Sequence, residues 1–84
     1  MRPVTVYSDE ICTLCHSVEN LLNVREIPYE KVMVQEGTDA YDQLVERTGM
    51  KSLPQVFVGS MLLGGYQETL AADQAGMLAD LLVD

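Results

Sequence analysis

The sequence predicts an α/β fold in which a four-stranded mixed sheet is covered by helices, in the order β-α-β-α-β-β-α. Two observations lead to this expectation. Short β-rich runs at residues 4–7 and 29–34 enclose a stretch of helical periodicity, and a strand–helix–strand unit implies a right-handed crossover and a parallel strand pair. Later, two apolar runs separated only by Gly59-Ser60 indicate a tight hairpin, whose strands must be antiparallel.

The first helix is expected from Cys12 to about Arg25, and Pro28 ends that segment. Its apolar face recurs at helical spacing and comprises Cys15, Val18, Leu21, Leu22 and, at the end, Arg25. The opposite, solvent-facing side is expected to carry Glu19, Asn20 and Asn23.

The second helix is expected to begin after Thr38, a residue type that caps helix N-termini. Asp39 and Asp42 then fall in the first turn, where acidic groups interact favourably with the helix dipole. Gly49 is the expected stop.

The C-terminal part begins with the hairpin, whose strands are predicted at residues 55–58 and 61–63, with Gly59 at the first turn position. Gly64-Gly65 is expected to end the second of these strands. A last helical region is predicted from about residue 67 to 82, with an interruption near Gly76.

Composition narrows the function classes. The chain has 84 residues, which predicts a single domain over residues 1–84, and its net charge of −8 argues against electrostatic binding to nucleic acid or an anionic membrane. No apolar run approaches the roughly 18 residues that span a bilayer, and the N-terminus does not resemble a signal peptide. We therefore expect a cytoplasmic protein. Two cysteines spaced C-x-x-C in such a chain indicate redox or metal chemistry.

The cysteine pair Cys12-Thr13-Leu14-Cys15 stands where the first strand gives way to the first helix. At a helix N-terminus, unpaired N–H groups and the dipole favour a thiolate, so Cys12 is the expected nucleophile. Cys15 lies about one turn further on and on the apolar face, which makes it the more buried, resolving thiol. An accessible attacker with a shielded resolver is the arrangement that two-step disulfide exchange requires.

Three alternatives remain for this pair. Cys12-x-x-Cys15-His16 also matches the attachment signature of c-type haem, which would require export and a different fold. Cys12, Cys15 and His16 would supply only three zinc ligands, and the sequence contains no further Cys or His for a closed tetrahedral site, so no metal is expected. The cysteines would otherwise be packing residues only. The simplest interpretation of His16 is a solvent-facing residue, and the alternative is that it tunes a thiol.

Two further segments are candidates for ligand binding. Pro54 stands directly before a strand and forces Leu53 into an extended conformation. A trans bond is the base-rate expectation, whereas a cis bond would turn the Leu53 backbone outward to pair with an extended peptide. Gly64-Gly65 before a helix leaves N–H groups that can hold a carboxylate, although the same pair also makes an ordinary turn.

Together these features resemble the glutaredoxins over essentially the whole chain. The matching segments occur in family order and are Tyr7-Ser8, Cys12-x-x-Cys15, Ser52 to Val58, Leu63-Gly64-Gly65 and a closing helix. The resemblance implies a thioredoxin fold, a cis Leu53–Pro54 bond and glutathione as cosubstrate, with no tightly bound cofactor. It also implies that glutathione binds along Leu53 and Pro54 and docks its γ-glutamyl end at Gly65, Tyr66 and Gln67, with Glu68 opening the helix.

The chain departs from the family pattern around the cysteines and after the double glycine. Asp9 replaces the usual Lys that binds the glycyl carboxylate of glutathione, Thr13-Leu14 replaces the usual Pro-Tyr, and Gln67-Glu68 replaces an acidic pair. Arg47 or Lys51 is a candidate for the missing cation, with plain surface charge as the alternative. A negative charge near Cys12 raises the pKa of its thiol and makes the reduced form less stable. We therefore expect a redox potential toward or below the lower end of the glutaredoxin range of about −200 to −230 mV.

The predicted function is therefore glutathione-dependent thiol–disulfide exchange on mixed disulfides or protein disulfides, by a monomeric protein. The nearest competing hypothesis is the same chemistry with electrons from a thioredoxin reductase, delivered to a partner such as ribonucleotide reductase. A third hypothesis is an iron–sulfur carrier, in which Cys12 and glutathione hold a cluster between two subunits. A fourth is an adaptor that retains only the fold.

Overall fold

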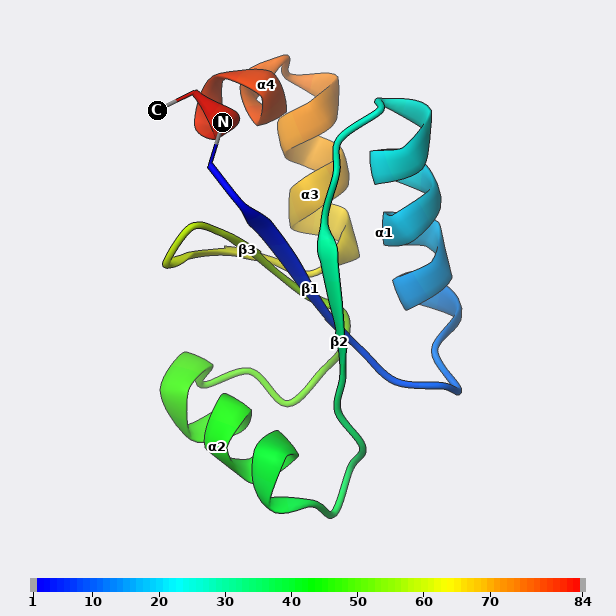
Figure 1. Cartoon of the computed structure of the whole chain (residues 1–84), viewed down its shortest axis with the longest axis vertical. Helices are drawn as coiled ribbons and strands as arrows, with labels where there is room; N and C mark the ends of the chain where they lie inside the picture. The colour runs from blue at the N-terminus through cyan, green and yellow to red at the C-terminus, as the bar shows by residue number, and fades with distance from the viewer. Residues whose placement is uncertain (1, 84) are drawn as a thin grey trace.

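The computed structural model describes residues 2–83, so Met1 and Asp84, the two ends of the expected domain, lie outside it. The expected order of elements is confirmed, with the last helical region divided in two (Figure 1). The elements are β1 (Val4–Ser8), α1 (Thr13–Val24), β2 (Glu30–Met33), α2 (Asp39–Thr48), β3 (Gln55–Val58), β4 (Met61–Gly64), α3 (Tyr66–Gln74) and α4 (Met77–Leu82).

The four strands form one mixed sheet in the order β2-β1-β3-β4. β1 pairs with β2 in parallel and with β3 antiparallel, and β3 and β4 form the antiparallel hairpin. This topology confirms the predicted parallel pair and the predicted hairpin. It also places β1 in the interior of the sheet, so the loop that follows Ser8 begins at the end of a central strand.

Side chains alternate between the two faces of the sheet and create two apolar clusters. The larger cluster lies on the face covered by α1, α3 and α4 and includes Val6, Val18, Leu22, Val56 and Leu78. The smaller cluster lies on the α2 face and is built on Val34, Leu44 and Phe57. Figure 1 shows α1 and α3 side by side, with α2 at the opposite end of the view.

The expectation that Glu19 faces solvent is wrong. Its residue surface is only 8% exposed, although Asn20 and Asn23 on the same helix are exposed as predicted. The Lys31 ammonium of β2 lies 2.9 Å from the Glu19 carboxylate. Burial of this carboxylate is tolerated because the lysine supplies an opposite charge.

The predicted end of the first helix is also corrected. α1 ends at Val24, and Arg25 is an exposed C-cap residue that does not belong to the apolar face. The Arg25 guanidinium donates to both carboxylate oxygens of Asp73 on α3, at 2.9 and 3.1 Å. This pairing raises the pKa of Arg25 and links α1 to α3.

The caps of α2 agree with the sequence. The Thr38 hydroxyl accepts a hydrogen bond from the Tyr41 N–H at 3.3 Å, which satisfies one of the free donors at the helix start. Gly49 follows the helix in a left-handed conformation with φ of 75°, as the predicted stop requires. These two ends fix the length of the helix that leads into the Leu53–Pro54 segment.

The junction between β4 and α3 differs from the expectation in one respect. The sequence predicts a strand that stops before Gly64, but Gly64 is the last residue of β4, and the break comes at Gly65. Gly64 has φ of 131°, and a Cβ atom there would lie 2.7 Å from the Glu68 Cβ. The strand can therefore reach Gly64 only because this residue has no side chain.

We expect Leu22→Ala to lower the free energy of unfolding by about 2–5 kcal/mol, because Leu22 is fully buried in the larger cluster. Val24→Ala, on the same helix but 75% exposed, is the matched control and should change it by less than about 0.5 kcal/mol. Urea unfolding of both variants provides the comparison. Similar losses in the two would contradict the packing described for α1.

Gly64→Ala is expected to destabilise the protein by about 1–3 kcal/mol more than Gly76→Ala, again by urea unfolding. Both glycines have positive φ, but a Cβ at Gly76 meets no atom within 4 Å, whereas one at Gly64 overlaps Glu68. The difference therefore combines the close approach of α3 with the φ of 131° at Gly64, which is less accessible to alanine than the left-handed conformation of Gly76. Equal losses would show that the approach is relieved at no cost.

Candidate active site

The loop after β1 carries the cysteine pair at the start of α1. Cys12 is the N-cap residue, with extended backbone angles of φ −133° and ψ 103°, and the helix proper begins at Thr13. No acidic residue lies in the first turn of α1. The N–H groups and the positive end of the helix dipole are therefore directed toward the Cys12 sulfur without a competing carboxylate from the same turn.

The two cysteines form a disulfide with a Cα–Cα distance of 5.2 Å. The Cys15 N–H donates a hydrogen bond to Cys12 Sγ at 3.1 Å. Cys12 is partly exposed, whereas Cys15 is 1% exposed beneath it. An attacking sulfur from solvent therefore reaches Cys12 first, as the sequence pattern indicates.

The Leu53–Pro54 segment lies beside Cys12. The peptide bond is cis, which confirms what the family resemblance implies and not the base-rate expectation. The buried Gln55 amide donates to the carbonyls of Met50 and Ser52 at 2.9 and 3.2 Å and so holds the preceding loop. Pro54 itself is buried, and Leu53 is partly exposed.

A cavity of about 250 Å³ joins this segment to the cysteine loop. Its lining residues are Asp9, Ile11, Cys12, Glu36, Tyr41, Lys51, Ser52 and Leu53. Sequence reasoning missed Glu36 and Tyr41, because they come from the segment after β2 and the start of α2 and carry no motif. The Tyr41 hydroxyl donates to the Lys51 carbonyl and thereby anchors α2 to the wall of the cavity.

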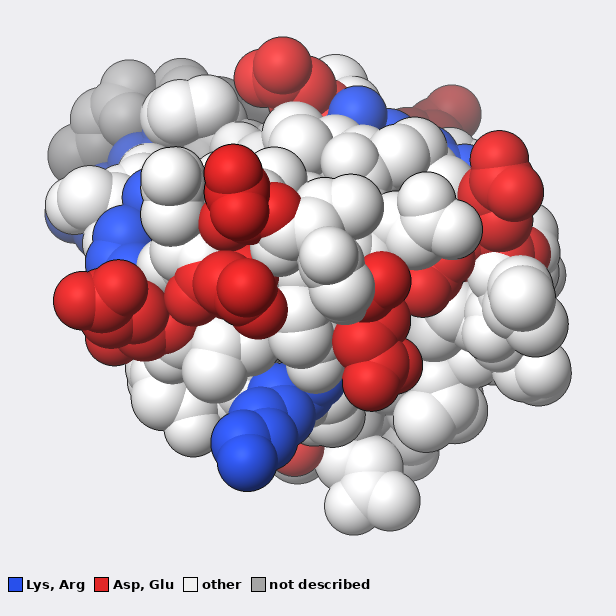
Figure 2. Space-filling view, turned by 90° about the horizontal axis from the view of Figure 1, so that it is seen from below, with Lys and Arg blue, Asp and Glu red and all other residues white. Residues whose placement is uncertain are grey.

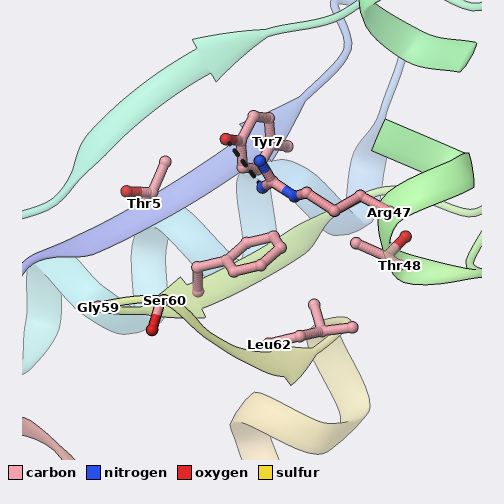
Figure 3. Close-up of a pocket in the computed structure, with 8 residues that line it drawn as sticks. Thr5, Tyr7, Arg47, Thr48, Gly59, Ser60 and Leu62 are labelled. Atoms are coloured by element: carbon pink, nitrogen blue, oxygen red, sulfur yellow. Dashed lines mark hydrogen bonds between the residues drawn. The ribbon is translucent and has the colours of Figure 1, made fainter. Parts of the chain in front are cut away.

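The two candidate cations are placed differently. Lys51 lines the cavity that contains Cys12. Arg47 lines another cavity, of about 510 Å³, together with Thr5, Tyr7 and Ser60 (Figure 3). There its guanidinium lies 4.9 Å from the centre of the Phe57 ring and donates to the Tyr7 hydroxyl at 3.4 Å. The structure thus brings Lys51, and not Arg47, to the redox centre.

The double-glycine segment lies next to the Leu53–Pro54 segment. A Cβ placed on Gly65 would lie 3.4 Å from the Pro54 carbonyl oxygen, so the N-terminus of α3 adjoins the cis-proline segment. The Gly65 N–H is already bonded to the Glu68 carboxylate at 3.0 Å. The helix opens at Tyr66, and Glu68 is its third residue, which caps it by reaching back.

His16 is not among the residues that line the Cys12 cavity. Its side chain is 66% exposed and lies 3.7 Å from the Glu19 carboxylate. Within residues 2–83, no three His, Cys, Asp or Glu side chains are grouped so that they could hold a metal ion. Over the same residues, no helix has the length and apolar character needed to cross a bilayer.

Comparison with known proteins identifies the family. The family model described as Glutaredoxin matches residues 4–63. Glutaredoxin 3 of Escherichia coli K12 is 27% identical over 82 residues, which covers 98% of this chain and 99% of that protein. A glutaredoxin of Vernicia fordii is 33% identical, with 96% of this chain and 81% of that protein covered.

Solved structures agree with this assignment. The holo form of glutaredoxin C1 from Populus tremula x tremuloides matches with a TM-score of 0.87 and 30% identity, covering 96% of this chain and 83% of that one. The buckwheat glutaredoxin–glutathione complex matches with a TM-score of 0.86 and 25% identity, covering 96% and 76%. The chain has the thioredoxin-like fold and belongs to the glutaredoxin family of glutathione-dependent thiol–disulfide oxidoreductases.

Proposed function

We propose that Cys12 is the nucleophile and Cys15 the resolving thiol in the reduction of mixed disulfides with glutathione and of protein disulfides. The Cys12 thiolate attacks one sulfur of the substrate disulfide, and the other sulfur leaves as a thiolate and takes up a proton. The observation that carries this assignment is the partly exposed Cys12 sulfur at the start of α1, with Cys15 buried beneath it.

The mixed disulfide on Cys12 has two ways forward. The Cys15 thiolate can attack Cys12 Sγ, which releases the substrate thiol and leaves the disulfide that the structure contains. Alternatively, a second glutathione attacks the glutathione sulfur of the intermediate, forms glutathione disulfide and frees Cys12. In the first route, two glutathione molecules then reduce the Cys12–Cys15 disulfide, so electrons balance in both cases.

Glutathione is proposed to lie in the cavity beside Cys12. Its backbone would pair with that of Leu53 next to Pro54, and the Lys51 ammonium would bind its glycyl carboxylate. The γ-glutamyl carboxylate would meet the start of α3 at Gly65, Tyr66 and Gln67. Because Glu68 already holds the Gly65 N–H, the N–H groups of Tyr66 and Gln67 are the proposed donors. The glutathione complex of the buckwheat relative supports this substrate.

Several finer points belong to the same proposal. Glutathione acts as a cosubstrate and not as a bound cofactor, and the protein works in the cytoplasm as a monomer. Ribonucleotide reductase stays a candidate among the disulfide-containing partners. The low redox potential expected from Asp9 also stays a prediction; Asp9 and Cys12 line one cavity, which supports it.

Cys12→Ser should abolish glutathione-coupled reduction of a small mixed disulfide, followed through NADPH and glutathione reductase, because the attacking sulfur is gone. Cys15→Ser should retain that turnover, since a second glutathione can resolve the intermediate, but should lose most reduction of a protein disulfide. Activity that survives Cys12→Ser, or that disappears equally in both variants and with both substrates, would contradict the assigned roles.

Lys51→Ala is expected to raise the KM for glutathione about two- to fivefold with little change in kcat, because one exposed charge pair is lost. Arg47→Ala is the matched control, as Arg47 lies in the other cavity and should leave the KM within about twofold. Steady-state kinetics at low ionic strength provide the test. An Arg47 effect equal to or larger than that of Lys51 would overturn the assignment.

A further inference from the structure

We propose that the surface around Cys12 selects protein disulfides whose flanking residues are basic and apolar, in preference to acidic substrates. This surface, the Cys12 rim, consists of Asp9, Glu10, Ile11, Leu14 and Glu36. The inference rests on the proposed role of Cys12 as the nucleophile and adds the class of protein substrate that it attacks.

The first observation is the charge of the cavities beside the reactive sulfur. Asp9 and Glu36 line the cavity that contains Cys12. Asp9 also lines an adjoining cavity of about 220 Å³, together with Glu10 and Met33. Among residues 2–83, Lys51 is the only cation lining either cavity. Three carboxylates and one ammonium therefore give the entrance a negative potential.

The second observation is that, within residues 2–83, these carboxylates form no ion pairs. The ion pairs found among the described residues bring cationic groups to Glu19 and Asp73, and none of them involves the acids of the Cys12 rim. Figure 2 shows Asp and Glu side chains spread over the face seen from below, the end of the molecule that carries α2. The chain as a whole has 13 acidic and 5 basic residues.

The third observation is the apolar surface on both sides of Cys12. Ile11 directly precedes the nucleophile and is 96% exposed, and Leu14 lies between the two cysteines and is 48% exposed. Met33, in the adjoining cavity, is also 48% exposed. A single exposed apolar residue is ordinary, but Ile11 and Leu14 flank the reactive cysteine in the chain and Met33 lines the adjoining cavity, and together they indicate a contact surface for a partner.

These observations favour one kind of occupant. Glutathione has two carboxylates and one ammonium, so its net charge is negative and the rim repels it except where Lys51 compensates. A Lys or Arg near a substrate disulfide is instead attracted by Asp9, Glu10 and Glu36, while an adjacent apolar side chain can cover Ile11. Two charges about 8 Å apart in water change the rate of encounter about twofold, and the effects of several charge pairs multiply. The rim therefore discriminates through charge and contact, while Cys12 performs the same exchange on every substrate.

The experiment measures one turnover without glutathione. Pre-reduced protein is mixed at low ionic strength with peptide disulfides that are identical except for flanking Lys, Ala or Glu. The peptide thiol released is followed by chromatography. We expect the second-order rate constant to be about five- to tenfold higher for the Lys peptide than for the Glu peptide, and about 0.5 M salt should remove most of this preference.

Matched variants separate the rim from net charge. Asp9→Asn combined with Glu36→Gln should reduce the Lys-over-Glu preference to about twofold or less. Glu30→Gln combined with Glu46→Gln removes the same charge from exposed positions that do not line the Cys12 cavity, and the preference should persist. Ile11→Ser should slow reduction of a peptide with a flanking Leu more than Val24→Ser does. Thermal melting of each variant confirms that it is folded.

The outcomes distinguish this inference from the proposed function. Equal rates for the Lys and Glu peptides, or the same loss of preference in both double variants, would overturn the selectivity while leaving Cys12 chemistry intact. If the wild-type protein reduces neither the peptides nor a small glutathione mixed disulfide, the proposed function itself fails. If the rate constant depends on a flanking Leu but not on a flanking Lys or Glu, the electrostatic part of the proposed selectivity is wrong.

Discussion

The contact between the Cys12 sulfur and the start of α1 is the interaction around which the site of this protein is built. The Cys15 N–H lies 3.1 Å from that sulfur, and its direction is set by the helix axis. The helix is held in turn by Val18 and Leu22, which are fully buried against the sheet. Apolar packing about one to two turns away thus determines where the polar end of the helix points, and this places Cys12 for its proposed role as the nucleophile.

The groups around Cys12 have opposite effects on the stability of its thiolate. The helix N-terminus stabilises a thiolate, whereas Asp9 and Glu36 in the same cavity disfavour negative charge. Among residues 2–83, Lys51 is the cation that lines this cavity, at a point where Tyr41 anchors the backbone. The balance suits a thiol that is reactive but whose entrance attracts positively charged partners. In the proposed binding mode, glutathione is held by Lys51 and by the backbone beside Pro54 and at the start of α3.

The sequence predicted the elements well, because their signals are local. Thr38 and Gly49 are residue types that favour the start and the end of a helix, and they cap the two ends of α2. Glu19 was misplaced because its burial depends on Lys31 of another strand, which periodicity cannot show. The sequence alone also does not predict the cavity lined by Cys12, Glu36 and Lys51, because three separate segments form it. The cis bond required family resemblance, because local propensity favours trans.

Selective alkylation of the reduced protein distinguishes the reactivity of Cys12 from that of Cys15. The protein is treated briefly with less than one equivalent of iodoacetamide at neutral pH, and peptide mass spectrometry identifies the modified cysteine. We expect modification at Cys12, whose sulfur is accessible and lies at the helix start, and almost none at Cys15, which is 1% exposed. Equal labelling of the two cysteines, or faster labelling of Cys15, would contradict this expectation.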